Sequence, residues 1–293
     1  MQTACEIQTP PLARAATASP RLGIIGGGQL ARMTALAARP LGVEVVVLEK
    51  DPHSPAARLL PDCVVGDWTD RDTLRKFAER CDVITLENEF VDADALEFLE
   101  RAGHEVFPGA ACMAVTQDKF TQKSVLQDFG LPVPAFRAVQ TPAEVVAAAR
   151  TFAWPVILKT RRNGYDGKGN FTLKSETYLA AGWQALGGGT HELMVEAWFP
   201  FVKELAVIVT RGRDGATAVY PVVETVQRNH VCHVVRAPAQ IPEELARQVH
   251  RTRLREPQAE AAAEAEHPER GDEGQQPQAR DEQRIDAAAE QAH

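Results

Sequence analysis

The residues best placed to do chemistry are a lysine and the glycine-rich basic loop that follows it. Lys159 closes the apolar run 154–158, and the loop 160–170 contains three glycines and three further basic side chains. Glycines let backbone N–H groups approach anionic oxygens closely, and basic side chains neutralise the charge of those oxygens. This combination predicts a phosphate-binding loop and a nucleotide-handling enzyme.

The loop is not a Walker A motif. The pattern G-x-x-x-x-G-K-[ST] does not occur in the chain, and the loop precedes the strand-like run 171–174, where a P-loop requires a helix. A glycine-rich turn between two strands can close over a triphosphate as a lid. The alternative from the residues alone is an ordinary surface hairpin with incidental basic side chains.

Composition separates a core-forming part from a tail. The chain has 293 residues, an apolar fraction of 44% and a net charge of −8. Segment 251–293 has only Leu254 and Ile285 as large aliphatic residues, and its six Arg against eleven Asp and Glu carry −5 of that charge. We expect this tail to be disordered, because it cannot bury a core. The remaining near-neutral 250 residues favour neither non-specific nucleic-acid binding nor binding to an anionic membrane.

Residues 1–20 contain no stretch typical of a signal peptide, and we expect them to be flexible. No window approaches the ~18 apolar residues of a membrane helix. The five cysteines are widely spaced without a C-x-x-C pair, which predicts neither disulfides nor a structural zinc site. The segment 230–233 contains two histidines and a cysteine, but neighbours on a strand point to opposite faces, so we expect no metal there. These features are typical of a cytoplasmic protein.

From residue 21 the pattern alternates between strands and helices. Runs 22–25, 43–48, 64–65 and 83–86 are strand-like, and 29–38, 70–80 and 92–101 are helix-like. This alternation predicts a doubly wound parallel sheet that binds ligands at the carboxyl ends of its strands. The turn Gly26 to Gly28 and Glu87 lie at such ends. With Glu49 as a ribose acceptor, the glycine turn also leaves an NAD-dependent oxidoreductase as an alternative, although G-x-G-x-x-G is not in register.

A second unit begins after residue 116. A helix over 118–129 is stopped by the glycine and prolines of 130–134, and a further helix is predicted over 142–151. A strand ends at Lys159, and two more are predicted over 192–199 and 204–209.

The order of these motifs resembles the ATP-grasp superfamily and, within it, the N5-carboxyaminoimidazole ribonucleotide synthetase family. The motifs are GGGQL at 26–30, Lys119 with Gln122 and Lys123, Lys159, GYDGKGN at 164–170, Glu196, Glu204 and YPVVE at 220–224. The resemblance covers about residues 21–248. It implies an α/β fold in which a Rossmann-like domain (21–115) precedes an ATP-grasp domain (116–250) with its lid over about 132–196.

The resemblance also implies a reaction. A ligase of purine (IMP) biosynthesis would use ATP and bicarbonate to carboxylate 5-aminoimidazole ribonucleotide, through carboxyphosphate, releasing ADP and phosphate. Phosphoryl transfer of this kind depends mainly on positioning and charge neutralisation, which suits lysines and backbone N–H groups.

Site residues follow from the resemblance in three groups. The ATP contacts would be Lys119, Lys159, Gly164, Tyr165, Asp166, Gly167, Lys168, Gly169, Asn170, Glu196, Ala197, Trp198, Phe199, Glu204 and Gln227. Among these, Lys159, Tyr165, Asp166 and Lys168 would serve catalysis, with the last three near bicarbonate. The second substrate would contact Gly26, Gly27, Gly28, Gln29, Leu30 and Glu87, with the glycine turn receiving its 5′-phosphate.

The chain departs from the family in two places. Thr225-Val226-Gln227 stands where many members have Asn-Ile-His. After about Arg247 the family's magnesium-binding glutamates and its substrate-binding Arg-Pro-His segment are missing, as if the reading frame had shifted. We therefore expect ATP with Mg²⁺ as cofactor but name no metal ligands, and an ATP-binding, inactive protein is the alternative. The resemblance further suggests a homodimer.

Overall fold

The computed structural model describes residues 19–164, 168–212, 214–228 and 231–252. Parts of the expected flexible amino terminus, of the lid loop and of the expected tail lie outside these ranges. The elements below belong to the unit that ends at Ala246, apart from the carboxyl-terminal half of the last helix, α8 (Glu243–Thr252).

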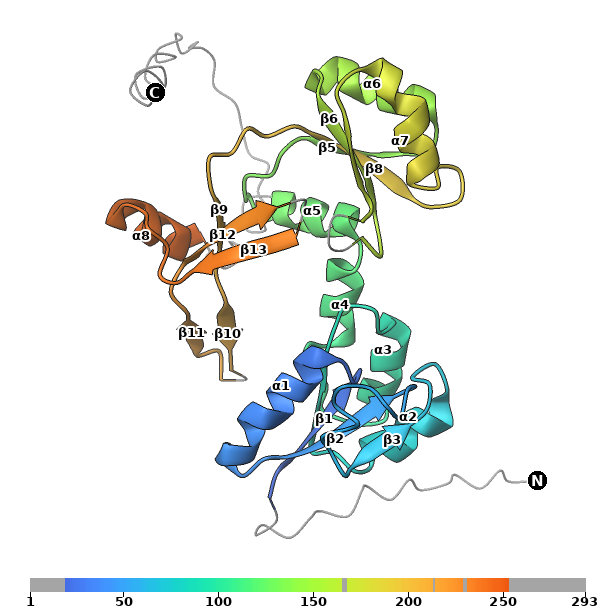
Figure 1. Cartoon of the computed structure of the whole chain (residues 1–293), viewed down its shortest axis with the longest axis vertical. Helices are drawn as coiled ribbons and strands as arrows, with labels where there is room; N and C mark the ends of the chain where they lie inside the picture. The colour runs from blue at the N-terminus through green and yellow to red at the C-terminus, as the bar shows by residue number, and fades with distance from the viewer. Residues whose placement is uncertain (1–18, 165–167, 213, 229–230, 253–293) are drawn as a thin grey trace, which may run out of the picture. The chain divides into compact units, whose positions relative to one another are not determined.

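The amino-terminal sheet is parallel, with strand order β3-β2-β1-β4. Its strands are β1 (Arg21–Ile25), β2 (Glu44–Glu49), β3 (Cys63–Val65) and β4 (Val83–Leu86). Successive strand residues point to opposite faces, so Val45 and Val47 pack under α1 (Gln29–Ala38), whereas Val46 and Leu48 pack on the other side. That second face is covered by α2 (Arg71–Ala78) and α3 (Ala93–Arg101) (Figure 1). The predicted doubly wound arrangement is confirmed.

Two helices follow this sheet. The short α4 (Ala110–Thr116), which the sequence did not predict, adds Ala110 and Met113 to the core of the amino-terminal sheet. α5 (Lys119–Asp128) begins two residues after Gln117, whose side-chain amide donates to the backbone carbonyls of Glu89 and Val91 at 2.8 and 2.6 Å. Single 3₁₀ turns occur at η1 (Arg39–Leu41) and η2 (Glu176–Tyr178).

A second, antiparallel sheet has the strand order β5-β8-β6-β7. Its strands are β5 (Phe136–Val139), β6 (Val156–Thr160), β7 (Asn170–Leu173) and β8 (Leu193–Ala197). One face packs against α6 (Pro142–Phe152) and α7 (Leu179–Ala185), which lie beside each other in Figure 1. On the other face the Phe120 ring of α5 meets Phe136 of β5 edge-on, with ring centroids 5.4 Å apart.

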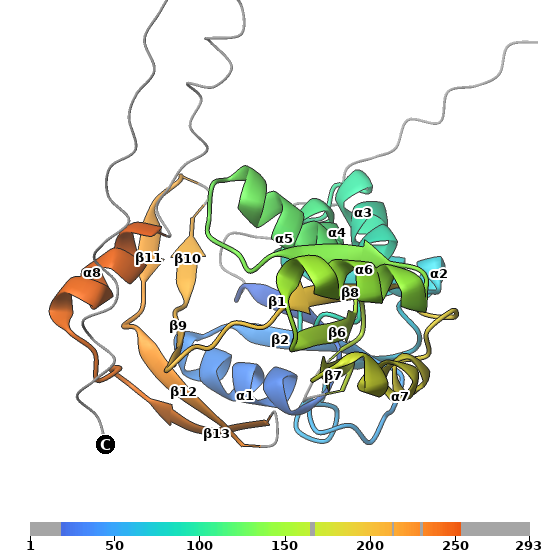
Figure 2. The same cartoon turned by 90° about the horizontal axis from the view of Figure 1, so that it is seen from above.

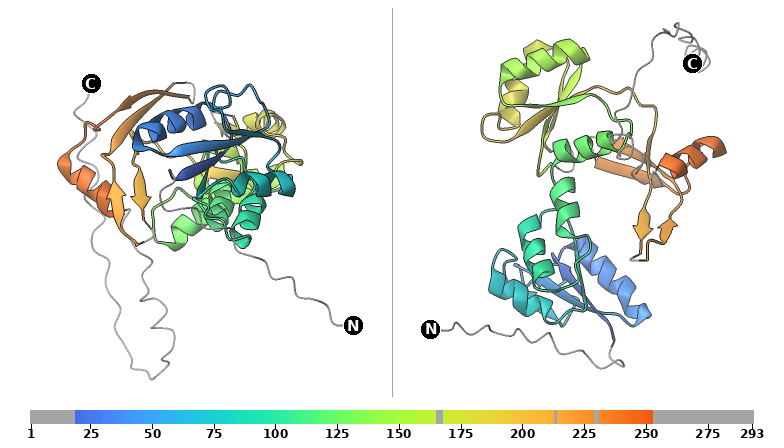
Figure 3. Two further views of the ribbon diagram at one scale, coloured as in Figure 1. Left: turned by 90° about the horizontal axis from the view of Figure 1, so that it is seen from below. Right: turned by 180° about the vertical axis from the view of Figure 1, so that it is seen from behind.

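The remaining strands form two antiparallel groups. β9 (Glu204–Ala206) and β13 (Val231–Arg236) flank β12 (Val223–Arg228), and Figure 2 shows β12 and β13 running side by side. β10 (Val209–Arg211) and β11 (Thr217–Val219) make a separate pair, drawn as two short arrows in Figure 3. The single strand predicted over 204–209 is therefore wrong: its first half pairs with β12 and its last residue begins a strand that pairs with β11.

α8 continues to Thr252, so helical structure runs two residues into the segment predicted as tail. Among the described helices, none is both long enough and apolar enough to cross a membrane.

Candidate active site

Three lysines and one glutamate meet on the sheet face that α5 covers. Lys123 lies one helical turn after Lys119, the first residue of α5, so the two side chains leave the helix on the same side. Lys159 in β6 and Glu196 in β8 point to this face, because their sequence neighbours belong to the core on the opposite face. The sequence predicted Lys119, Lys159 and Glu196 as nucleotide contacts; it assigned no role to Lys123.

Glu196 is the centre of this cluster and is only 5% exposed. Its Oε1 accepts a hydrogen bond from Lys123 Nζ at 2.8 Å, and its Oε2 lies 2.5 Å from Lys159 Nζ. Burial acts to raise the pKa of this carboxyl, but the two lysines outweigh burial and hold the pKa below its ordinary value. Glu196 is therefore ionised at neutral pH and balances only one of the two lysine charges.

Lys119 adds a further positive charge. Burial lowers its pKa, and repulsion from Lys159 lowers it again. Its Nζ donates to the backbone carbonyl of Gly164, 3.2 Å away at the start of the glycine loop. Glu89 also acts on Lys119, but three lysines against the carboxylates of Glu196 and Glu89 still leave an excess of positive charge. This excess suits a polyanionic ligand such as a triphosphate.

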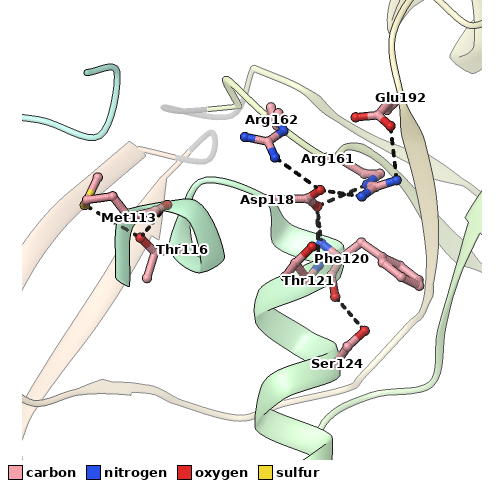
Figure 4. Close-up of polar contacts among 9 residues, drawn as sticks. All are labelled: Met113, Thr116, Asp118, Phe120, Thr121, Ser124, Arg161, Arg162 and Glu192. Atoms are coloured by element: carbon pink, nitrogen blue, oxygen red, sulfur yellow. Dashed lines mark hydrogen bonds and ion pairs between the residues drawn. The ribbon is translucent and has the colours of Figure 1, made fainter. Parts of the chain in front are cut away.

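A buried aspartate fixes the first turn of α5 (Figure 4). Asp118 is 1% exposed and caps the helix by accepting from the backbone N–H groups of Phe120 and Thr121. Both of its oxygens also accept hydrogen bonds from Arg161. Oδ1 accepts from Nε at 3.0 Å, and Oδ2 accepts from Nη2. Burial acts to raise the Asp118 pKa, but these bonds outweigh it and the pKa lies below its ordinary value.

Arg161, which directly follows β6, also contacts α5 and the residue before β8. Its guanidinium lies 5.1 Å from the centre of the Phe120 ring and 3.3 Å from an oxygen of Glu192. Its backbone carbonyl accepts from the N–H of Lys119 at 2.8 Å. Because Lys159 stands two residues before Arg161, these contacts fix the distance between the two predicted phosphate-binding lysines.

The glycine loop is closely packed at its base. The backbone N–H of Thr160 donates to the carbonyl of Gly169 at 2.9 Å, and Asn170 pairs with Lys159 across β6 and β7. Gly169 has a φ of +79°, and a Cβ placed there would lie 2.3 Å from Thr160 Oγ1. Only glycine fits this position without strain. Tyr165, Asp166 and Gly167, predicted in the lid, lie outside the described residues.

The predicted adenine and ribose residues occupy two strands. Ala197 ends β8, and Trp198 and Phe199 follow it with exposed rings. Glu204 opens β9 and accepts from Thr225 Oγ1 at 2.6 Å and from Gln227 Nε2 at 2.7 Å. Thr225 lies directly opposite Glu204 in the β9–β12 register, so it is part of this group although the sequence did not predict a role for it.

The amino-terminal glycine turn already holds two carboxylates. Gly27 N–H donates to Glu49 Oε2 at 2.6 Å, and Gly28 N–H donates to Glu87 Oε2 at 2.9 Å. Leu30 N–H donates to the other oxygen of Glu87 at 3.2 Å. A phosphate at this turn would have to displace both acidic side chains, so the geometry favours hydrogen-bond donors, such as hydroxyl or amino groups, as ligands of Glu87.

Glu49 is also the residue on which the NAD alternative depended. Its second oxygen accepts from the backbone N–H groups of Lys50 and Asp51 at 2.7 and 3.3 Å. Both oxygens of its carboxylate are therefore engaged by the backbone, which leaves little capacity for a ribose.

Within the described ranges, no group of three or more His, Cys, Asp and Glu side chains converges in a way that could hold a metal ion.

Two family models match the chain. Residues 20–117 match the "Ribonucleotide synthetase preATP-grasp domain", and residues 124–255 match the "ATP-grasp domain".

Curated relatives and solved structures agree with these matches. The N5-carboxyaminoimidazole ribonucleotide synthase of Synechococcus elongatus is 42% identical over 228 residues, covering 78% of this chain and 57% of the relative. A chloroplastic phosphoribosylaminoimidazole carboxylase of Vigna aconitifolia is 41% identical, covering 75% of this chain and 39% of the relative. This chain thus spans about half the length of the curated relatives it matches.

Among solved structures, an ADP complex of an N5-carboxyaminoimidazole ribonucleotide synthetase is 37% identical with a TM-score of 0.75, covering 80% of this chain and 62% of that one. An Aspergillus clavatus synthase in complex with ADP and 5-aminoimidazole ribonucleotide is 33% identical with a TM-score of 0.73, covering 80% of this chain and 61% of that one.

Proposed function

We propose a function from one premise: the chain belongs to the N5-carboxyaminoimidazole ribonucleotide synthetase branch of the ATP-grasp family. The proposed activity is the ATP-dependent carboxylation of 5-aminoimidazole ribonucleotide by bicarbonate, which yields N5-carboxyaminoimidazole ribonucleotide, ADP and phosphate in purine biosynthesis. The observation that carries the proposal is the pairing of Lys123 and Lys159 with the buried Glu196, with Lys119 close to Lys159.

ATP would bind with its phosphates on Lys119 and Lys159. These lysines repel each other in the free protein. A polyphosphate between them replaces that repulsion by attraction, so binding is favoured by charge as well as by contact. Gly164 to Asn170 would cover the phosphates, the segment Glu196 to Phe199 would lie beside adenine, and Glu204 with Gln227 would contact the ribose.

The chemistry would then proceed in two transfers. A bicarbonate oxygen attacks the γ-phosphorus, the bond to the β-phosphate oxygen breaks, and ADP leaves with carboxyphosphate formed. The exocyclic amine of the ribonucleotide then attacks the carboxyl carbon, phosphate leaves with the electron pair of its oxygen, and the amine loses a proton. The lysines would neutralise charge on the transferring group, and Tyr165, Asp166 and Lys168 would act near bicarbonate.

The second substrate would lie at the turn from Gly26 to Leu30. Glu87 offers carboxylate oxygens to its hydroxyl or amino groups, and Gln29 follows the turn at the first position of α1. We further propose that ATP enters as its magnesium complex, that the chain forms homodimers and that it acts in the cytoplasm.

A second candidate is ATP binding without turnover. It is favoured by the lack of a convergent carboxylate set for Mg²⁺ within the described ranges. Two measurements on the full chain separate the candidates: ATP binding by calorimetry, and ADP release with ATP, magnesium and bicarbonate, with and without the ribonucleotide.

ADP release that rises with the ribonucleotide would support the ligase. Binding without release would support the second candidate, and absence of ATP binding would overturn both. Lys159→Met should weaken ATP binding. Lys174→Met is the matched control, because Lys174 is exposed just beyond β7.

A further inference from the structure

The carboxylate of Glu196 is shared by two lysines. Lys123 Nζ donates to Oε1 at 2.8 Å, and Lys159 Nζ lies 2.5 Å from Oε2. Lys159 is the lysine that pairs with Asn170 at the end of the glycine loop and that lies close enough to Lys119 to lower the Lys119 pKa. Of the two lysines, Lys159 is therefore the one placed to contact a phosphate.

The burial of Glu196 makes its second lysine important. A carboxylate that is 5% exposed is stable in its ionised form only beside a positive charge. If Lys159 turned toward a nucleotide phosphate while Lys123 remained, Glu196 would keep one full partner. If Lys123 were missing, the same movement would leave a buried carboxylate alone.

We propose that Lys123 is a positioning residue that keeps Glu196 paired while Lys159 exchanges that carboxylate for the phosphates of ATP. This proposal rests on the proposed function, since it assumes that ATP binds at Lys159. Lys123 itself need not touch the nucleotide. Its role is to release Lys159 from an ion pair that would otherwise compete with the ligand.

The test is a double-mutant comparison of ATP affinity by calorimetry on the full chain, with thermal melting to verify folding. Lys123→Met should weaken ATP binding roughly ten- to hundredfold, the range expected when a partly exposed lysine is removed from a buried carboxylate. Lys123→Arg should bind ATP close to the unmodified chain, because it retains the charge and the donors. Lys174→Met serves as the control for loss of a lysine charge.

The decisive variant is Lys123→Met combined with Glu196→Gln. With no carboxylate charge left to hold Lys159, this double variant should regain most of the affinity that Lys123→Met loses. If Lys123 only supported local packing, replacing Glu196 as well would not restore the ATP affinity.

Two results would overturn the proposal. One is ATP affinity of Lys123→Met equal to that of the unmodified chain; the other is a double variant that binds no better than Lys123→Met. An unmodified chain that fails to bind ATP would overturn the proposed function together with this proposal, so the two failures are distinguishable.

Discussion

The Arg161 guanidinium donates hydrogen bonds to both carboxylate oxygens of Asp118. These bonds connect the residue after β6 to the first turn of α5. The same aspartate caps the helix that carries Lys119 and Lys123. One buried ion pair thereby supports a helix start and sets the position of basic groups on two elements.

We expect Asp118→Ala to lower the free energy of unfolding by about 3 kcal/mol, because it removes a helix cap and leaves a partly buried guanidinium with less compensation. Asp118→Asn should recover about 1 kcal/mol of this loss, since the amide oxygen can still cap the helix. Urea unfolding followed by circular dichroism measures both values. Asp128→Ala, at the exposed end of the same helix, is the control, and a loss of under about 0.5 kcal/mol for Asp118→Ala would contradict the role of the pair.

The helices of this chain differ in how far local sequence determines them. The bounds of α1 agree with the prediction, because its start follows a glycine turn, its buried alanines repeat at helical spacing and Pro40 comes just after its end. α4 was missed because it has only seven residues, too few for a clear helical repeat. Hydrophobic periodicity identifies a helix of several turns such as α1, but gives little signal for a short helix such as α4.

The residues of the candidate site also fall into two groups: those that form a local sequence pattern and those that meet only in the folded chain. Lys159 and the glycine loop stand out as a local pattern. The contact between Asp118 and Arg161 spans 43 residues, and that between Lys123 and Glu196 spans 73. No spacing rule connects residues so far apart, because their meeting depends on how α5 packs against the β5–β8 sheet.

Stability should fall in acid. The Asp118 and Glu196 carboxyls have folded pKa values below their ordinary values of 3.8 and 4.5, so the folded state binds fewer protons than the unfolded chain. Their stabilisation is complete above the unfolded pKa values and is lost as the pH drops through the lower, folded ones. We expect the free energy of unfolding, measured in urea, to fall from about pH 5 toward pH 3.

The variant Asp118→Asn provides the check on this pH dependence, since an amide does not titrate. Its free energy of unfolding should decline less steeply over the same range. Equal slopes for the two proteins would show that Asp118 does not carry the effect.

Gly169 should be intolerant of any side chain. Gly42 has a similar φ of +72° but nothing within 4 Å of an added Cβ, so Gly42→Ala should cost only the backbone penalty of about 1 kcal/mol. Gly169→Ala should cost about 1–3 kcal/mol more, because its Cβ would meet Thr160 Oγ1 at 2.3 Å. Thermal unfolding of both variants measures the difference. Adding Thr160→Ala should recover part of the loss, and no recovery would mean that the clash lies elsewhere.

Replacing Glu87 should distinguish two hypotheses for the second-substrate site, because they predict opposite changes in affinity for the ribonucleotide. Its oxygens accept hydrogen bonds from the backbone N–H groups of Gly28 and Leu30, so these donors of the turn are already bound to a carboxylate. If Glu87 accepts donors from the ribonucleotide, Glu87→Gln should weaken its binding about ten- to hundredfold, since hydrogen bonds to charged groups contribute about 1.5–3 kcal/mol.

If the glycine turn instead receives the 5′-phosphate, removing the Glu87 charge removes repulsion and Glu87→Gln should bind the ribonucleotide more tightly. We expect weaker binding, measured by calorimetry with the ribonucleotide alone, together with unchanged affinity for ATP. Glu97→Gln, on the exposed side of α3, is the matched control. Tighter binding would favour the phosphate at the turn, because a phosphate has no hydrogen-bond donor that a carboxylate there could accept.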